Sequence, residues 1–206
     1  MVNFYPSRRD VFRIGGSALV LPHLTNALQA KAVHACGMVI DDLTGIGLQG
    51  IRVSNGRDIV LTDFAGKFEV PYDGNSPIFL IKPSGWATLI NEQTMLPKFH
   101  DNSGTHAPIT FRLRKQQESH VFEVIMFADP QPGNAIEMAY LREQISRGPI
   151  GASAAFGITL GDLVGDDLSL FGRYNQVISQ IGLPWWNLPG NHDLDFSAKS
   201  ASEARA

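Results

Sequence analysis

The stretch that decides the fold is Phe156-Gly157-Ile158-Thr159-Leu160-Gly161-Asp162, an apolar run of strand length that ends in glycine and aspartate. Two further apolar runs of strand length lie on either side of it, at residues 121–128 and 185–188. Segments with helical periodicity separate the three runs. A strand-helix-strand-helix-strand order predicts a parallel sheet whose faces are covered by helices.

Both predicted helices carry start or stop signals. The first begins at Asn134, which forms a capping-box-like pair with Glu137. It extends to Ser146 with apolar residues at approximate helical spacing, Ile136, Ala139, Tyr140 and Ile145. The second presents one apolar face and ends at Gly182 and Pro184; that face contains Leu168, Phe171, Tyr174, Ile178 and Ile181.

Polar residues follow each predicted strand. They are Asp129-Pro130-Gln131, Gly161-Asp162 and Gly190-Asn191-His192-Asp193. Because parallel strands end at the same edge of a sheet, these clusters are expected to meet at the edge where open α/β sheets hold ligands. Polar groups gathered there need a partner, and a cation is the natural one.

In this order, the three clusters resemble the signature of the calcineurin-like metallophosphoesterase superfamily. That signature contains Asp-x-His, then Gly-Asp-x-x-(Asp/Gly), then Gly-Asn-His-(Asp/Glu), then further histidines. This chain has Asp129-Pro130-Gln131, Gly161-Asp162-Leu163-Val164-Gly165-Asp166 and Gly190-Asn191-His192-Asp193. The resemblance implies hydrolysis of phosphate mono- or diesters with two divalent metal ions, Mn, Fe or Zn.

The resemblance also implies roles for individual residues. Asp162 would bridge the two ions, Asp129 would bind the first, and Asn191 would bind the second through its amide oxygen. His192 would protonate the leaving oxygen without binding metal. Asp193 would orient His192, since a carboxylate beside an imidazole fixes its tautomer.

Two features depart from the family pattern. Gln131 stands where the family has histidine, so it would be a weaker ligand for zinc or iron and would favour a harder ion. A packing role for Gln131 is the alternative. No histidine follows His192, although the family has three more. This chain is therefore expected to be a truncated gene product or fragment, inactive by itself.

Residues 33–115 predict an all-β sandwich. Short apolar-alternating runs are separated by turn signals such as Asn55-Gly56. The candidate strands are Gly37–Ile40, Gly50–Ser54, Asp58–Thr62, Lys67–Val70, Ile78–Lys82 and Ile109–Arg114. The hairpin Thr62-Asp63-Phe64-Ala65-Gly66-Lys67-Phe68 resembles transthyretin-like or Ig-like modules beside exported bacterial enzymes. Such a module either binds a glycan or partner, or serves as a spacer packed on the catalytic domain.

Within this region His100, Asp101 and His106 are close in sequence. They are either solvated loop residues or, alternatively, a second metal site. The polar segment 115–120 has no periodicity and is a fair linker. The predicted organisation is thus a signal segment at 1–32, a sandwich at 33–115, and the first half of a phosphoesterase domain at 116–206.

The N-terminus resembles a twin-arginine export signal. Ser7-Arg8-Arg9-Asp10-Val11-Phe12-Arg13 precedes a weakly apolar segment, and Ala30-Lys31-Ala32 offers the small residues that signal peptidase reads. The expected location is periplasmic or secreted, with cleavage after Ala32. The alternatives are a capped helix beginning at Ser7, or lipid attachment at Cys36.

Composition excludes several other classes. The formal net charge is −3 with no long run of one sign, so no nucleic-acid-binding surface is indicated. No uninterrupted apolar stretch reaches the roughly 18 to 20 residues that span a bilayer. Two functions remain: a phosphoester hydrolase, or a periplasmic binding or structural protein whose phosphoesterase portion is degenerate. The sequence indicates neither the individual substrate nor the oligomeric state.

Overall fold

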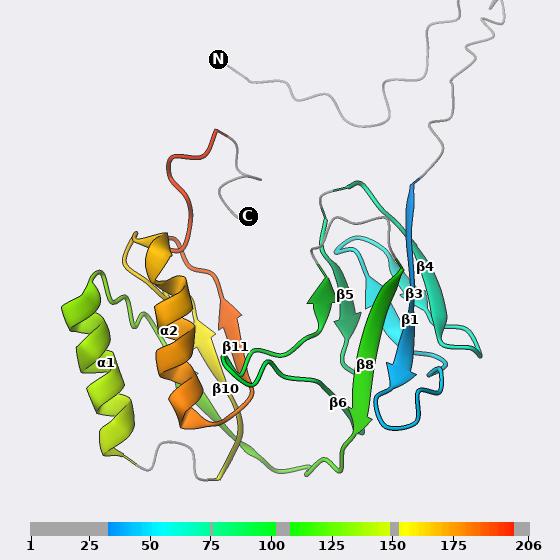
Figure 1. Ribbon diagram of the computed structural model, residues 1–206, viewed down its shortest axis with the longest axis horizontal. Coiled ribbons are helices and arrows are strands. Elements are labelled where there is room, and N and C mark those ends of the chain that lie inside the picture. Colours follow the sequence, from blue (N-terminus) through cyan, green and yellow to red (C-terminus); the bar gives the residue numbers. More distant parts are fainter. Residues whose placement is uncertain (1–32, 75, 102–107, 149–152, 200–206) are drawn as a thin grey trace, which may run out of the picture. The chain divides into compact units, whose positions relative to one another are not determined.

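The computed structural model describes residues 33–74, 76–101, 108–148 and 153–199. Of the predicted features, the signal segment at 1–32 and His106 lie outside the described residues. The described part is mostly β-sheet with few helices (Figure 1). None of its helices has the length and apolar character needed to cross a membrane.

The first sheet has four strands in the order β4-β1-β8-β6. These are β4 (Lys67–Pro71), β1 (His34–Asp41), β8 (Ile109–Lys115) and β6 (Trp86–Thr88). Strand β1 pairs parallel with β8 and antiparallel with β4, and β6 pairs antiparallel with β8. Strand β8 alternates strictly between inward apolar and outward polar side chains, as a strand with one buried face requires.

The second sheet is antiparallel, in the order β3-β2-β5-β7. Its strands are β3 (Ile59–Leu61), β2 (Arg52–Ser54), β5 (Ile78–Ile81) and β7 (His100–Asp101). All six strands predicted from the sequence are present. The strands β6 and β7 were missed, because two or three residues are too few to show an alternating pattern.

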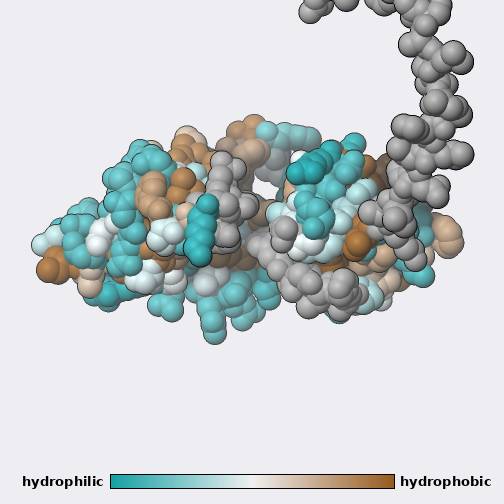
Figure 2. Space-filling model, turned by 90° about the horizontal axis from the view of Figure 1, so that it is seen from above, coloured by the Kyte–Doolittle hydropathy of each residue, from teal (hydrophilic) through white to brown (hydrophobic). Residues whose placement is uncertain are grey.

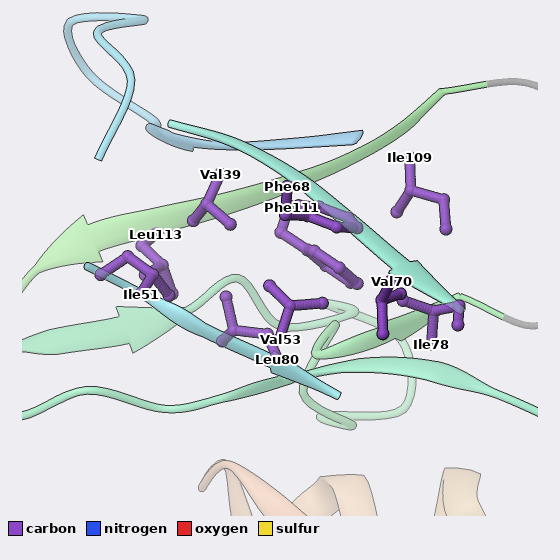
Figure 3. Packing of buried hydrophobic residues seen from close by; sticks show 10 residues of the cluster. All are labelled: Val39, Ile51, Val53, Phe68, Val70, Ile78, Leu80, Ile109, Phe111 and Leu113. Atoms are coloured by element: carbon purple, nitrogen blue, oxygen red, sulfur yellow. The ribbon is translucent and has the colours of Figure 1, made fainter. Parts of the chain in front are cut away.

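The two sheets share one core, which makes this region a sandwich (Figure 3). At its centre the rings of Phe68 and Phe111 stack with centroids 5.9 Å apart. The buried members come from both sheets: Val39, Ile51, Val53, Phe68, Val70, Ile78, Leu80, Ile109, Phe111 and Leu113. The prediction of a β-rich N-terminal region is therefore confirmed.

The Thr62–Phe68 hairpin has a clear physical basis. The buried Thr62 hydroxyl donates to the Leu48 carbonyl at 2.5 Å and accepts from the Ile51 N–H at 2.9 Å. The Asp63 carboxylate accepts from the N–H groups of Ala65 and Lys67. Gly66 has φ +77°, and a Cβ there would lie 2.4 Å from the Val39 carbonyl oxygen. Only glycine fits that corner without strain.

The second region is a three-stranded parallel sheet in the order β11-β10-β9. Its strands are β9 (Glu123–Phe127), β10 (Ala154–Leu160) and β11 (Trp185–Leu188). Helix α1 (Ala135–Arg147) connects β9 to β10. Between β10 and β11 come η1 (Leu168–Leu170), α2 (Phe171–Ile178) and η2 (Ser179–Ile181).

The helix starts follow from local chemistry. The Asn134 side chain caps α1 by accepting from the N–H groups of Ile136 and Glu137, as predicted. The predicted apolar face of the second helix is confirmed, since all five of its members belong to one core cluster. The face predicted for α1 was partly wrong. Met138 and Ile145 are buried, whereas Ile136 and Tyr140 are exposed.

Both helices pack against one face of the parallel sheet. The fully buried Trp185 ring lies directly over Gly157, where a Cβ would come within 1.9 Å of it. Trp185 donates its indole N–H to the Thr159 hydroxyl at 2.9 Å, and that hydroxyl also bonds the Tyr174 hydroxyl at 2.7 Å. Burial raises the pKa of Tyr174 to about 12. This polar chain is satisfied inside the core and fixes β10 and β11 against α2.

The opposite face of the same sheet is also apolar. Side chains alternate along strands, so the neighbours of the buried residues point away from the helices. Among them, Met126, Leu160 and Leu188 have exposed fractions of 65%, 46% and 48%. Phe156 packs edge-on against Trp186 with centroids 5.2 Å apart. Figure 2 shows the molecule from above, with hydrophobic residues lying among hydrophilic ones on the surface in view.

Candidate functional site

Three loops bring polar side chains together at the carboxyl ends of the parallel strands. Asp129 follows β9, Asp162 follows β10, and residues 190–193 follow β11. Backbone hydrogen bonds join the first two loops: the Gln131 N–H donates to the Asp162 carbonyl at 3.1 Å, and the Gly165 N–H donates to the Pro132 carbonyl at 3.3 Å. The edge predicted from sequence is therefore a single, internally bonded surface.

Asp162 is at the centre of this surface and is only 6% exposed. Its Oδ1 accepts from the backbone N–H of His192 at 3.0 Å, and its Oδ2 accepts from Nε2 of Gln131 at 2.6 Å. The His192 N–H, and to a smaller extent the Gln131 amide, hold the pKa of Asp162 below its ordinary value. The carboxylate is therefore ionised and fixed in place near neutral pH.

The Asp129 side chain interacts with the Asp162 carboxylate and is the smallest of the influences that lower the pKa of Asp162. The third loop also approaches closely: a Cβ on Gly190 would lie 2.0 Å from Oδ1 of Asp162. Glycine at this position allows the loop to reach the carboxylate. Asn191, the next residue, is exposed in the same loop. All four predicted metal ligands thus belong to loops at this edge, and three of them interact directly.

The backbone of the site is strained. Five described residues other than glycine have positive φ, and four of them are here: Asp129 (φ +48°), Gln131 (φ +40°), Asp162 (φ +49°) and Asp166 (φ +64°). Residues with a Cβ rarely adopt this region, and such conformations concentrate at functional sites. Each positive-φ conformation costs free energy. Glycine would avoid that cost, but it has no side chain, and here the conformation directs a polar side chain into the site.

The two residues predicted to act on a proton are both present, but their pairing differs from the expectation. Nδ1 of His192 bonds Oδ1 of Asp166 at 2.8 Å. Asp193 is 7% exposed and accepts from three backbone N–H groups, those of Leu163, Val164 and Gly190, at 2.8–3.1 Å. Asp193 therefore fixes the two loops, and Asp166 is the carboxylate that orients His192.

Sequence reasoning missed the role of Asp166, although the quoted Gly161–Asp166 motif contains it. Adjacency in sequence favoured Asp193, but consecutive residues in a tight loop point in different directions. The hydrogen bond to Asp166, together with the charges of Asp162 and Asp193, raises the pKa of His192 above its ordinary value. The imidazole is thereby held nearer to its protonated form.

Within residues 33–199, apart from the gaps noted above, no group of three His, Cys, Asp or Glu side chains is arranged to hold a metal ion. The side chains that meet at Asp162 are a second carboxylate, that of Asp129, and the Gln131 amide, whose nitrogen faces Asp162. Oxygen donors of this kind suit hard divalent cations such as manganese or magnesium.

Comparison with known proteins gives one informative match. Residues 37–116 match the family model described as the N terminal of Calcineurin-like phosphoesterase. A search of curated proteins found no match. The matched segment coincides with the β-sandwich, from β1 through β8, and ends just before the parallel sheet. The match supports a relationship of this chain to the calcineurin-like phosphoesterase superfamily.

Proposed function

We propose that the strand-end surface around Asp162 belongs to a metal-dependent phosphoesterase that hydrolyses phosphate mono- or diesters with two divalent cations. The observation that carries the proposal is the Asp162 carboxylate, which is only 6% exposed and is held by donors from the loops after β9 and β11, with Asp129 as an acidic neighbour. Two carboxylates side by side repel one another unless a proton or a cation lies between them. The His192 N–H and the Gln131 amide both donate to Asp162 and favour its ionised form, so a cation is the partner that we propose for this acidic pair.

The residues present fit such a cation. Asp129, Asp162 and Asn191 carry oxygen donors on loops from three strand ends, and Gly190 allows the third loop to lie close to Asp162. A bound divalent ion would lower the pKa of a water molecule and neutralise the charge of a phosphate ester. Asp162 would be held ready for this role by the His192 N–H, which leaves lone pairs on both carboxylate oxygens free for coordination.

His192 is the candidate proton donor. Its Nδ1 is occupied by Asp166, so Nε2 is the nitrogen left for a substrate. A raised pKa keeps Nε2 protonated nearer to neutral pH, which suits transfer of that proton to a leaving alkoxide oxygen. His192 is 37% exposed at its side chain, so a substrate can reach it.

The alternative is a binding or structural protein in which the sandwich recognises the partner and the α/β region is degenerate. Gln131 in place of the expected histidine favours this alternative. A phosphoesterase should hydrolyse phosphate esters, whereas a binding protein should not.

The test is hydrolysis of bis-p-nitrophenyl phosphate and p-nitrophenyl phosphate by metal-loaded protein, using this chain and a longer form that carries the further histidines of the family pattern. Turnover is expected of the longer form, in which the substitutions below are made. Manganese, iron and zinc are tried separately. Our proposal predicts metal-dependent release of p-nitrophenol that falls by about 100-fold or more in His192→Ala and in Asp162→Asn. Arg142→Ala, an exposed change on α1, is the control. Absence of turnover with every metal would favour the binding protein.

A further inference from the structure

The position of Gln131 permits two roles. In the first, its amide oxygen is a ligand to the first cation. In the second, its amide nitrogen donates a hydrogen bond and the side chain binds no metal. The structure favours the second, because Nε2 lies 2.6 Å from Oδ2 of Asp162.

Chemistry fixes this orientation of the amide. An ionised carboxylate has no proton to donate, so only the NH₂ end of a glutamine can face it favourably. Turning the amide would place two oxygen atoms against each other. The low pKa of Asp162 is consistent with a donor in this position. The amide is therefore held by the charge of its neighbour and does not rotate freely.

A main-chain hydrogen bond also holds Gln131 against Asp162. The Gln131 N–H donates to the carbonyl of Asp162, the residue whose side chain accepts from its Nε2. Its φ of +40° sets the direction in which the side chain leaves the main chain. Two hydrogen bonds from one residue to another, across loops that follow different strands, restrict Gln131 to a small range of positions.

We propose that Gln131 is a positioning residue: it donates to Oδ2 of Asp162 and holds that carboxylate in place before any cation is bound. This inference takes one point from the proposed function, namely that Asp162 binds a cation. A histidine at residue 131 would be free to bind metal, whereas the glutamine found here stabilises its neighbour. Of the two ligands predicted in the loop after β9, only Asp129 would then bind the cation.

Thermal unfolding in EDTA separates the two roles, because a metal ligand contributes nothing when no metal is present. Gln131→Met keeps the length of the side chain and removes the donor. Our proposal predicts that it lowers the melting temperature in EDTA by about 5 °C, the loss expected for a hydrogen bond to a buried charge. Gln180→Met, which alters an exposed glutamine in η2, is the matched control and should leave the melting temperature unchanged.

Manganese titration provides the second arm. A positioning role predicts that Gln131→Met weakens manganese binding by less than about tenfold, and a direct ligand predicts a greater loss together with an unchanged melting temperature in EDTA. The latter result would overturn the inference. Gln131→Glu places a third carboxylate beside Asp129 and Asp162, so it should unfold at a lower temperature in EDTA and recover on addition of manganese.

A direct measurement on wild-type protein covers the case in which the variants do not fold. In metal-free protein, the side-chain NH₂ protons of Gln131 should exchange slowly with solvent in NMR spectra, because one is bonded to Asp162. Exchange as rapid as that of Gln180 would contradict the inference. Failure of the proposed function is seen separately, as absence of manganese binding by the wild-type protein, and leaves this result unaffected.

Discussion

The two regions of the molecule place different residues at positions of left-handed backbone. In the sandwich these positions are glycines, Gly45, Gly50, Gly56, Gly66, Gly74 and Gly85, and Met95 is the described exception. In the α/β region, four positive-φ residues are not glycine: Asp129, Gln131, Asp162 and Asp166. Glycine relieves the strain of a turn, whereas aspartate and glutamine retain it. In the loops that follow the parallel strands, strain is therefore found where polar side chains gather, which supports the site that we propose there.

The regions also differ in how their sheets are covered. Each sandwich sheet buries one face against the other sheet, so a single apolar face per strand suffices. The parallel sheet is apolar on both faces, but the described helices pack on only one. Parallel sheets are normally covered on both sides. The packed face should therefore carry most of the stability of this region, and the predictions below test that difference.

The largest effect is expected for Gly157→Ala. A Cβ at this position would lie 1.9 Å from the buried Trp185 ring, so β10 and β11 would have to move apart. The expected loss is about 3 kcal/mol in the free energy of unfolding, measured by denaturant titration with tryptophan fluorescence. Hydrogen exchange should show that the loss is confined to the α/β region.

Gly172→Ala is the control for this change. Gly172 lies in α2, and beyond its chain neighbours and the backbone of its own helix no atom lies within 4 Å of the position that its Cβ would take. Alanine there should stabilise the helix by about 0.5–1 kcal/mol. Equal stability of Gly157→Ala and wild type would show that the inner face is not tightly packed.

A smaller loss is expected for Asp193→Asn. The amide has one oxygen in place of two, so it cannot accept from all three backbone N–H groups that meet the carboxylate. The stability should fall by about 2 kcal/mol, seen in chemical denaturation. Asp195→Asn, in the same loop, is the comparison, and its carboxylate accepts only from Ser197 among the hydrogen bonds described. An equal effect of the two changes would argue against a structural role for Asp193.

Asp166→Gly should change stability by less than about 1 kcal/mol, because glycine adopts φ +64° without strain. The same change removes the carboxylate that pairs with Nδ1 of His192. The proton on Nδ1 should give a downfield NMR resonance in wild type, and this resonance should be lost in the variant through exchange with solvent. If that resonance persists in the variant, Asp166 is not the partner of His192.

The smallest effect concerns Glu118, next to the sandwich. The Lys82 ammonium, the Gly85 N–H and the Ser84 hydroxyl lower the pKa of Glu118 from 4.5 to about 2. A carboxylate whose folded-state pKa is lowered stabilises the protein above pH 4.5, and the contribution is lost as the pH falls towards 2. Glu118→Gln should therefore flatten the decrease in melting temperature between pH 5 and 2, measured by calorimetry. An unchanged pH profile would contradict this assignment.

The sequence predicted most strands because their alternation and turn residues are local signals. Trp185–Leu188 and the Asn134 cap were obtained from a few residues each. The exposure of Ile136 and Tyr140 was missed because tertiary packing decides which face of α1 is buried, and α1 places Met138 and Ile145 in the shared core cluster. Spacing likewise placed Asp129, Asp162 and residues 190–193 at one edge.

Side-chain pairing within the site could not be obtained in the same way. Whether His192 meets Asp166 or Asp193 depends on loop dihedrals such as φ +64° at Asp166, and these leave no periodic signal in the sequence. The donor role of Gln131 depends on which end of an amide faces Asp162. Both are properties of loop geometry.

The central feature of the proposed site is a divalent cation shared by Asp129 and Asp162. Isothermal titration of metal-free protein with manganese, comparing wild type with Asp162→Asn, measures this directly. We predict saturable binding by wild type and an affinity at least about tenfold weaker in the variant, with the fold retained in both. Equal binding by the two proteins, or no binding by wild type, would contradict it.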